Sequence, residues 1–118
     1  HLVAVGVEAS IRFASPAAVF VPTRSGATAR SLALCRMPVW IVGVSSEQQT
    51  CKDLAFSYGV YPVYDPVHPD DWNAYVRNWL ERHQLAGDLA VVTEGPSRRH
   101  PDAHNRMEII DLRRPQKP

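Results

Sequence analysis

Strand-like and helix-like segments alternate along almost the whole chain of 118 residues. Short apolar runs, which predict strands, occupy residues 17–21, 39–44, 60–64, 89–92 and 107–112. Segments with apolar residues three and four positions apart, which predict helices, occupy residues 2–14, 27–35, about 46–58 and 72–84. This alternation predicts an α/β fold, a three-layer αβα sandwich around a five-stranded, mostly parallel sheet.

The last two predicted strands are joined by residues 94–106, which show no helical period. A parallel pair needs a crossover that usually contains a helix, so we predict that the final strand is antiparallel. Pro62 interrupts the third predicted strand. Proline cannot donate a backbone hydrogen bond, and we therefore expect that strand at an edge of the sheet.

Composition indicates one globular domain, with 45% hydrophobic and 21% charged residues. The net charge of +1 gives no general attraction to nucleic acid or to a membrane surface. Cys35 and Cys51 lie in helix-like segments without metal-type spacing, so we expect reduced cysteines, no metal site and a cytoplasmic protein. The chain begins without Met inside a helical pattern, and we interpret residues 1–118 as one domain of a longer protein.

The turn after the first predicted strand has the composition of an anion site. Residues 19–28 read Val-Phe-Val-Pro-Thr-Arg-Ser-Gly-Ala-Thr and lead directly into a helix-like segment. A helix N-terminus offers unpaired N–H groups and partial positive charge, which suit phosphate. The candidate phosphate-binding residues are Thr23, Arg24, Ser25, Gly26, Ala27 and Thr28. The alternative is an ordinary capped helix, because Ser and Thr are common N-caps.

Two further helices are predicted in more detail. Residues 46–49, Ser-Glu-Gln-Gln, match a capping box, and Gly59 is the expected C-cap of that helix. Its predicted buried face consists of Cys51, Leu54, Ala55 and Tyr58. The segment 72–84 is the clearest amphipathic helix, and we expect it to stop near Gly87. We interpret its stripe as core, formed by Trp72, Tyr75, Val76, Trp79, Leu80 and His83.

The unpatterned segment 94–106 is long for a compact domain, and such loops are often functional. It follows a strand, as the turn at residues 23–28 does, so both should lie at the carboxyl edge of the sheet, where ligands bind. A small independent enzyme using His100, His104 or Asp102 is a further alternative. Pro101 between the two histidines disfavours a helical metal-binding pair.

Five segments in order resemble the C-terminal domain of pyruvate kinase, and together they cover nearly the whole chain. They are Val7-Glu-Ala-Ser10, Val19-Phe-Val-Pro-Thr-Arg-Ser-Gly26, Val39-Trp-Ile-Val-Gly-Val44, Tyr58-Gly-Val-Tyr-Pro-Val63 and Val92-Thr-Glu-Gly95. The closing Asn105-Arg-Met-Glu-Ile-Ile110 resembles the end of the same family. The resemblance implies a five-stranded α/β domain that binds phosphorylated effectors and carries no catalytic residues.

The resemblance also implies which residues would hold an effector. In family members of the fructose 1,6-bisphosphate type, the turn matching Thr23–Thr28 holds one phosphate. The effector loop corresponds to residues after the fourth strand, and Trp72 lies roughly where some family members place an effector-contacting tryptophan. The implied loop residues are Gly95, Ser97, Arg98, Arg99, His100 and Asn105.

Departures from the family leave the effector open. Residues 98–105 replace a glycine-rich loop, Trp79 stands where some members have an arginine, and Arg77 is near but out of register. A sugar monophosphate or a nucleotide is therefore as good a candidate as a bisphosphate.

Two functions follow from the resemblance. The first is the regulatory domain of a pyruvate kinase, which as a whole enzyme transfers a phosphoryl group from phosphoenolpyruvate to ADP. Its partners would be the effector and the remainder of that chain. The Mg²⁺ and K⁺ cofactors belong to a catalytic barrel that these residues do not contain, so we expect no activity from the chain alone. The alternative is a ligand-free subunit-interface domain, in which the last strand pairs across a two-fold axis in a homo-oligomer.

Overall fold

The structure is a computed structural model, and it describes residues 16–34, 36, 38–67, 69–94 and 106–114. Five strands form one sheet in the order β3-β2-β1-β4-β5. The first four pair in parallel and β5 is antiparallel to β4, which confirms the predicted sheet and its last strand. The predicted helix at residues 2–14 lies outside the described residues. The elements are β1 (Pro16–Pro22), α2 (Ala27–Leu34), β2 (Ile41–Ser45), α3 (Gln48–Leu54), β3 (Val60–Tyr64), α4 (Trp72–Arg82), β4 (Leu89–Glu94) and β5 (Arg106–Asp111).

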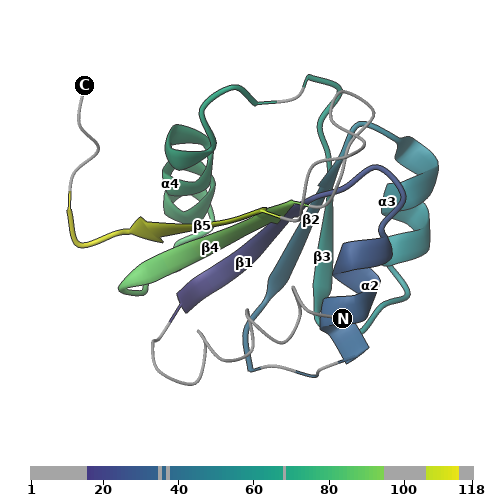
Figure 1. The fold of residues 1–118 in the computed structure, drawn as a ribbon, viewed down its shortest axis with the longest axis horizontal. Helices are drawn as coiled ribbons and strands as arrows, with labels where there is room; N and C mark the ends of the chain where they lie inside the picture. Colours follow the sequence, from purple (N-terminus) through teal and green to yellow (C-terminus); the bar gives the residue numbers. More distant parts are fainter. Residues whose placement is uncertain (1–15, 35, 37, 68, 95–105, 115–118) are drawn as a thin grey trace.

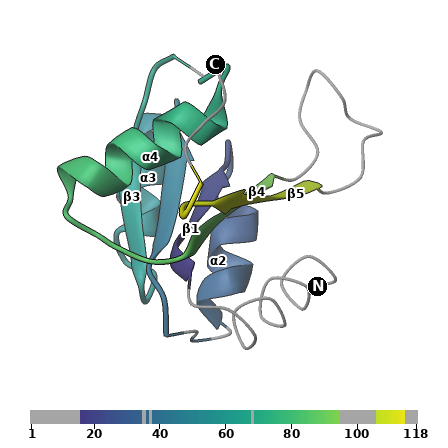
Figure 2. The same cartoon turned by 90° about the vertical axis from the view of Figure 1, so that its left-hand side faces the viewer.

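Helices cover both faces of the sheet, with α2 and α3 on one side and α4 on the other (Figures 1 and 2). The central strand β1 is buried on both faces, because its alternate side chains enter two different cores. Val19 and Val21 pack in the cluster with α2 and α3, whereas Ala18 and Phe20 pack in the cluster with α4. The predicted three-layer αβα sandwich is therefore confirmed.

Helix α4 begins where an acidic side chain caps it. The carboxylate of Asp71 accepts a hydrogen bond from Ala74 N at 3.2 Å, as N-cap residues commonly do. Trp79 meets Phe20 of β1 edge-to-face, with ring centroids 5.4 Å apart. The predicted core stripe is confirmed for its buried members, Trp72, Val76, Trp79 and Leu80.

The end of α4 differs from the prediction. The helix stops at Arg82, and Gln84 adopts the left-handed conformation with φ 55°. Leu85 N donates to Leu80 O at 3.0 Å and Gln84 N donates to Glu81 O at 3.2 Å, the two bonds of a Schellman motif. The helix is thus closed before Gly87. His83 at the C-cap is exposed, and its ring stacks on that of Trp79 with the ring centroids 3.8 Å apart. Because it is exposed, His83 is not the core residue that was predicted.

The predicted capping box and C-cap of α3 are wrong. Glu47 is the N-cap and makes no side-chain cap bond, and the hydroxyl of Ser45 accepts from Glu47 N at 3.1 Å instead. The helix ends at Leu54, so Tyr58, at 64% exposure, follows the helix and does not pack beneath it. Ala55 is also exposed, and Gly59 lies in the turn before β3 with φ 69°.

Strand β3 forms one edge of the sheet, as Pro62 predicted. Ile41 N donates to Gly59 O and Asp65 N donates to Ser45 O, each at 2.9 Å. The backbone N–H and C=O groups of the odd-numbered residues in this segment therefore face β2. Pro62 therefore presents its donor-free nitrogen to the open side, where it disfavours pairing with another strand. Within the described ranges, no helix has the length and hydropathy required to cross a bilayer.

Candidate anion-binding site

The turn between β1 and α2 is held at the carboxyl edge of the sheet by two neighbouring elements. Thr23 N donates to Val44 O of β2 at 2.9 Å, which extends the strand pairing to the start of the turn. The hydroxyl of Thr50 in α3 donates to Arg24 O at 2.5 Å, and Thr50 is itself buried. The turn is therefore held in place by one hydrogen bond to the sheet and one to α3.

A glycine occupies the N-cap position of α2. Arg30 N donates to Gly26 O at 2.9 Å, the first bond of the helix, and Gly26 has φ 85°. A conventional N-cap side chain accepts from the second or third N–H group of the helix, which glycine cannot do. Within the part of the chain that the structure describes, the N–H groups of Thr28 and Ala29 have no partner. These are the two donors that an anion would use.

The hydroxyl groups of the turn are partly engaged. Gly26 N donates to the Thr23 hydroxyl oxygen at 2.7 Å, and Ala27 N donates to the Ser25 hydroxyl oxygen at 3.3 Å. Both oxygens act as acceptors in these bonds, so each hydroxyl keeps its own hydrogen for donation. The turn can therefore stabilise its own backbone and still present hydroxyl donors to an anion.

Two arginines supply positive charge beside the turn. Arg24 Nε lies 3.8 Å from Glu47 Oε1, and both side chains are about half exposed, at 53% and 51%. Such an ion pair contributes little and leaves the guanidinium free to reorient. Arg30 Nη1 would lie 2.8 Å from a Cβ atom at Gly26, so this second guanidinium covers the N-cap. Arg30 was not among the residues predicted from the sequence, although its spacing four residues after Gly26 was the available signal.

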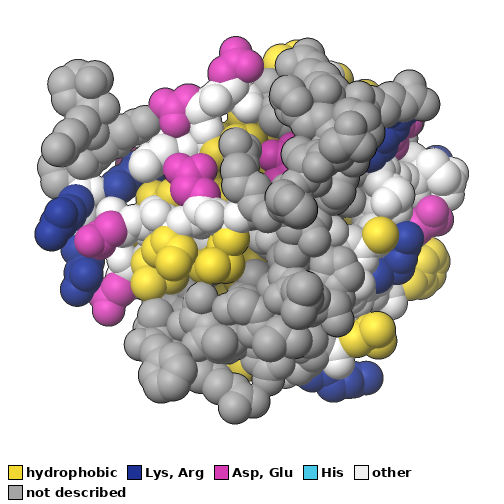
Figure 3. Space-filling model, viewed as in Figure 1, with side chains coloured by type: hydrophobic (Ala, Val, Ile, Leu, Met, Phe, Trp, Pro, Cys, Tyr) yellow, Lys and Arg dark blue, Asp and Glu magenta, His cyan; other side chains and the backbone are white. Residues whose placement is uncertain are grey.

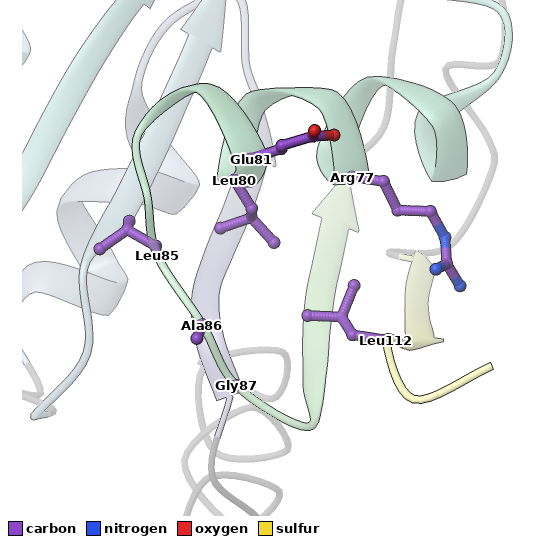
Figure 4. A pocket seen from close by; sticks show the side chains of 7 residues that line it. All are labelled: Arg77, Leu80, Glu81, Leu85, Ala86, Gly87 and Leu112. Atoms are coloured by element: carbon purple, nitrogen blue, oxygen red, sulfur yellow. The ribbon is translucent and has the colours of Figure 1, made fainter. Parts of the chain in front are cut away.

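Helix α4 contributes less to this edge than the resemblance implies. Trp72 is only 6% exposed and packs in the core with its ring 5.1 Å from that of Tyr75. Arg77 donates to Asn73 Oδ1 at 2.6 Å and to Asp111 O at 2.8 Å, which ties α4 to the end of β5. Arg77 lines a hollow of about 260 Å³ together with Leu80, Glu81 and Leu112 (Figure 4). It is thus engaged away from the Thr23–Thr28 turn.

The remaining predicted site residues follow β4. Because β1 and β4 are parallel, their carboxyl ends share one edge, which confirms that the chain leaves both strands on the same side. Gly95, Ser97, Arg98, Arg99, His100 and Asn105 lie outside the described residues, so their role stays a prediction. His104 and Asp102 lie there too. Elsewhere, the described residues contain no group of three acidic, His or Cys side chains suited to a metal ion.

A second hollow, of about 380 Å³, runs between β3 and α4 and is lined by aromatic side chains. Tyr61 meets Trp79 edge-to-face at 5.8 Å, and Tyr75 lies nearby. Burial raises the pKa of the Tyr75 hydroxyl, and the neighbouring carboxylate of Asp65 adds to this rise against the opposing charge of Arg82. Neither hollow includes the turn. Within the turn, Arg24 and Ser25 are exposed and Thr28 is half-buried, whereas Ala29 is buried.

Comparisons with other proteins agree with this architecture. The family model described as "Pyruvate kinase, alpha/beta domain" matches residues 3–110. The pyruvate kinase of Thermococcus litoralis is 46% identical over 44 residues, which are 37% of this chain and 9% of that protein. The structure of Cryptosporidium parvum pyruvate kinase in complex with ADP superposes with a TM-score of 0.79 at 20% identity. That match covers 92% of this chain and 22% of the other. The chain belongs to the pyruvate kinase α/β domain family.

Proposed function

We propose that this domain binds a phosphorylated metabolite at the Thr23–Thr28 turn and serves as the regulatory domain of a pyruvate kinase. In the whole enzyme, binding would bias the arrangement of the subunits and so the distant active site, which requires different affinities for two states. Transfer of a phosphoryl group from phosphoenolpyruvate to ADP belongs to that whole enzyme, in the cytoplasm. The effector class is a sugar phosphate or a nucleotide.

One observation carries the proposal, namely the glycine at the N-cap of α2. It leaves the N–H groups of Thr28 and Ala29 without a described partner, at a strand's carboxyl end. The hydroxyls of Thr23 and Ser25 accept from the preceding N–H groups of Gly26 and Ala27, and the guanidinium of Arg24 belongs to the same turn. Helix N-termini with this combination of donors and charge favour phosphate over neutral ligands.

Calorimetric titration of the chain tests the proposal. The probes are glucose 6-phosphate, fructose 1,6-bisphosphate and AMP, with glucose as the uncharged control. We expect saturable binding of at least one phosphorylated probe, lost in Arg24→Glu and Ser25→Asp, which place a carboxylate in the turn. Arg82→Glu, the same charge change on α4, should leave the affinity unchanged. If no phosphorylated probe binds, the regulatory function is wrong.

The subunit-interface function is favoured by a different observation at β5. Met107 and Ile109 are 42% and 54% exposed, and they lie on the face opposite to buried Ile110. Hydrophobic side chains are visible over the β4–β5 side of the sheet in Figure 3. Among the described strands, β5 pairs only with β4, so its outer edge is open to a second copy of the chain.

Light scattering at increasing protein concentration tests this second function. A mass that rises towards a dimer, that is unaffected by phosphorylated probes and that falls to the monomer in Ile109→Lys would support it. A monomer at all concentrations would exclude it for this chain. Phosphate binding by a monomer would leave only the regulatory function.

A further inference from the structure

Thr93, near the end of β4, has a hydroxyl group that the fold buries without a hydrogen-bond partner. The residue is 0% exposed, and its Oγ1 atom meets no partner among the described residues. Burial of an unpaired hydroxyl is unfavourable, and valine has nearly the same shape without this penalty. A polar group of this kind in a native fold is therefore a candidate for a role in function.

Thr93 lies on the face of the sheet that carries the candidate anion site. The register of β1 with β4 pairs Phe20 with Val92, and its continuation by one residue places Val21 beside Thr93. Val21 and Val91 both pack in the cluster beneath α2, so the alternation of side chains turns Thr93 to the same face. Thr23 follows Val21 by two positions, and its hydroxyl also contacts the N-terminus of α2.

Continued past Val21 to Thr23, the same register makes the two threonines diagonal neighbours at the carboxyl edge. Diagonal neighbours in a sheet lie about 7–8 Å apart, a separation that a single phosphate group can bridge with one oxygen towards each hydroxyl. Thr93 is also one residue from the end of β4, where ligands of parallel sheets bind. The position of Thr93 and its unpaired hydroxyl are independent observations, and both indicate a role in ligand binding.

We propose that Thr93 is a further binding residue of the anion site and that its hydroxyl donates to the same phosphate as Thr23. The inference rests on the proposed function, because it adds a donor to that site. Since Thr93 is buried, contact with the phosphate requires a local rearrangement at this edge, as a substantial minority of binding sites show. The hydroxyl would then gain the partner that it lacks in the described structure.

The test compares Thr93→Val and Thr93→Ala, which remove the hydroxyl, with Thr93→Ser, which keeps it. Each variant of the full chain is unfolded in urea and titrated with glucose 6-phosphate and inorganic phosphate. We expect Thr93→Val to unfold at an equal or higher urea concentration and to bind about ten-fold or more weakly, since a hydrogen bond to a charged group is lost. Thr93→Ser should bind within about three-fold of the unaltered chain, by the same reasoning.

The outcomes separate this inference from the proposed function. Unchanged affinity in Thr93→Val and Thr93→Ala, with binding by the unaltered chain, would overturn the role of Thr93 alone. A large loss of stability in Thr93→Val would show that the hydroxyl has a structural partner and would also overturn it. No binding of either probe by the unaltered chain would overturn this inference and leave the proposed function dependent on the other two probes.

Discussion

Gly26 carries the strongest local constraint in the candidate site. Its φ of 85° is unfavourable for other residues, and a Cβ atom there would lie 2.8 Å from Arg30 Nη1 and 3.1 Å from Leu54 Cδ2. We expect Gly26→Ala to lower the free energy of unfolding by about 1–3 kcal/mol, measured in urea. Gly59→Ala is the matched control, because Gly59 has φ 69° but no atom within 4 Å of its Cβ position. An equal loss of unfolding free energy in both variants would show that the positive φ alone, and not the contact with Arg30 and Leu54, causes the destabilisation.

The proposed anion would compete with Glu47 for Arg24, since Arg24 Nε lies 3.8 Å from Glu47 Oε1. We expect Glu47→Gln to strengthen binding of the phosphorylated probe by about two- to five-fold, the range of an exposed ion pair. The measurement is calorimetric titration at low salt, where screening is weakest. Glu81→Gln makes the same charge change on α4 and should have no effect. An equal gain in affinity in both variants would mean that the net charge of the chain, and not the Arg24–Glu47 pair, controls binding.

Two sites show where the sequence was sufficient to predict local structure and where it was not. The turn at Thr23–Gly26 could be located because a strand pattern changes there to a helical one. The capping box could not be placed, because Ser45 and Ser46 are both residues that favour the N-cap position. The pairing of Ser45 with Tyr64 keeps Ser45 in the strand and moves the helix start to Gln48. Tertiary pairing thus decided a boundary that local pattern left ambiguous.

At the level of elements, the C-terminal end of α4 places Gln84 in the left-handed conformation, which is unfavourable for a residue other than glycine. Gln84 has φ 55°, which costs a non-glycine residue about 1–2 kcal/mol. We expect Gln84→Gly to raise the free energy of unfolding by about 0.5–1 kcal/mol, after the entropic cost of glycine. Gln49→Gly, inside α3, should lower it by about 1 kcal/mol. Urea denaturation measures both, and a loss in Gln84→Gly would contradict the Schellman assignment.

Arg77 connects α4 to β5 through its bond to Asp111 O. We expect Arg77→Met to lower the free energy of unfolding by about 1–3 kcal/mol, because charged hydrogen bonds are lost while the apolar stem remains. Its affinity for phosphorylated probes should be unchanged. Arg82→Met, at an exposed position of the same helix, is the control for stability. Weaker phosphate binding in Arg77→Met would place Arg77 in the site after all.

At the level of the whole molecule, the alternation of strands and helices was enough to predict the layers and the antiparallel last strand. It could not define the floor of the candidate site, because that depends on which elements become neighbours. Thr50 of α3 reaches Arg24 only because β2 lies beside β1. Thr93, the further binding residue proposed above, lies on the neighbouring strand only because β4 pairs with the other side of β1. The burial of Trp72 likewise follows from the packing of α4 on the sheet.

The central claim is that the N-terminus of α2 binds phosphate, and amide NMR tests it most directly. A ¹⁵N-labelled sample is titrated with glucose 6-phosphate, fructose 1,6-bisphosphate and AMP, and with glucose as control. We predict saturable shifts for at least one phosphorylated probe, largest at the backbone amides of Thr28 and Ala29 and absent with glucose. Shifts centred on another surface, or none that saturate, would contradict the claim.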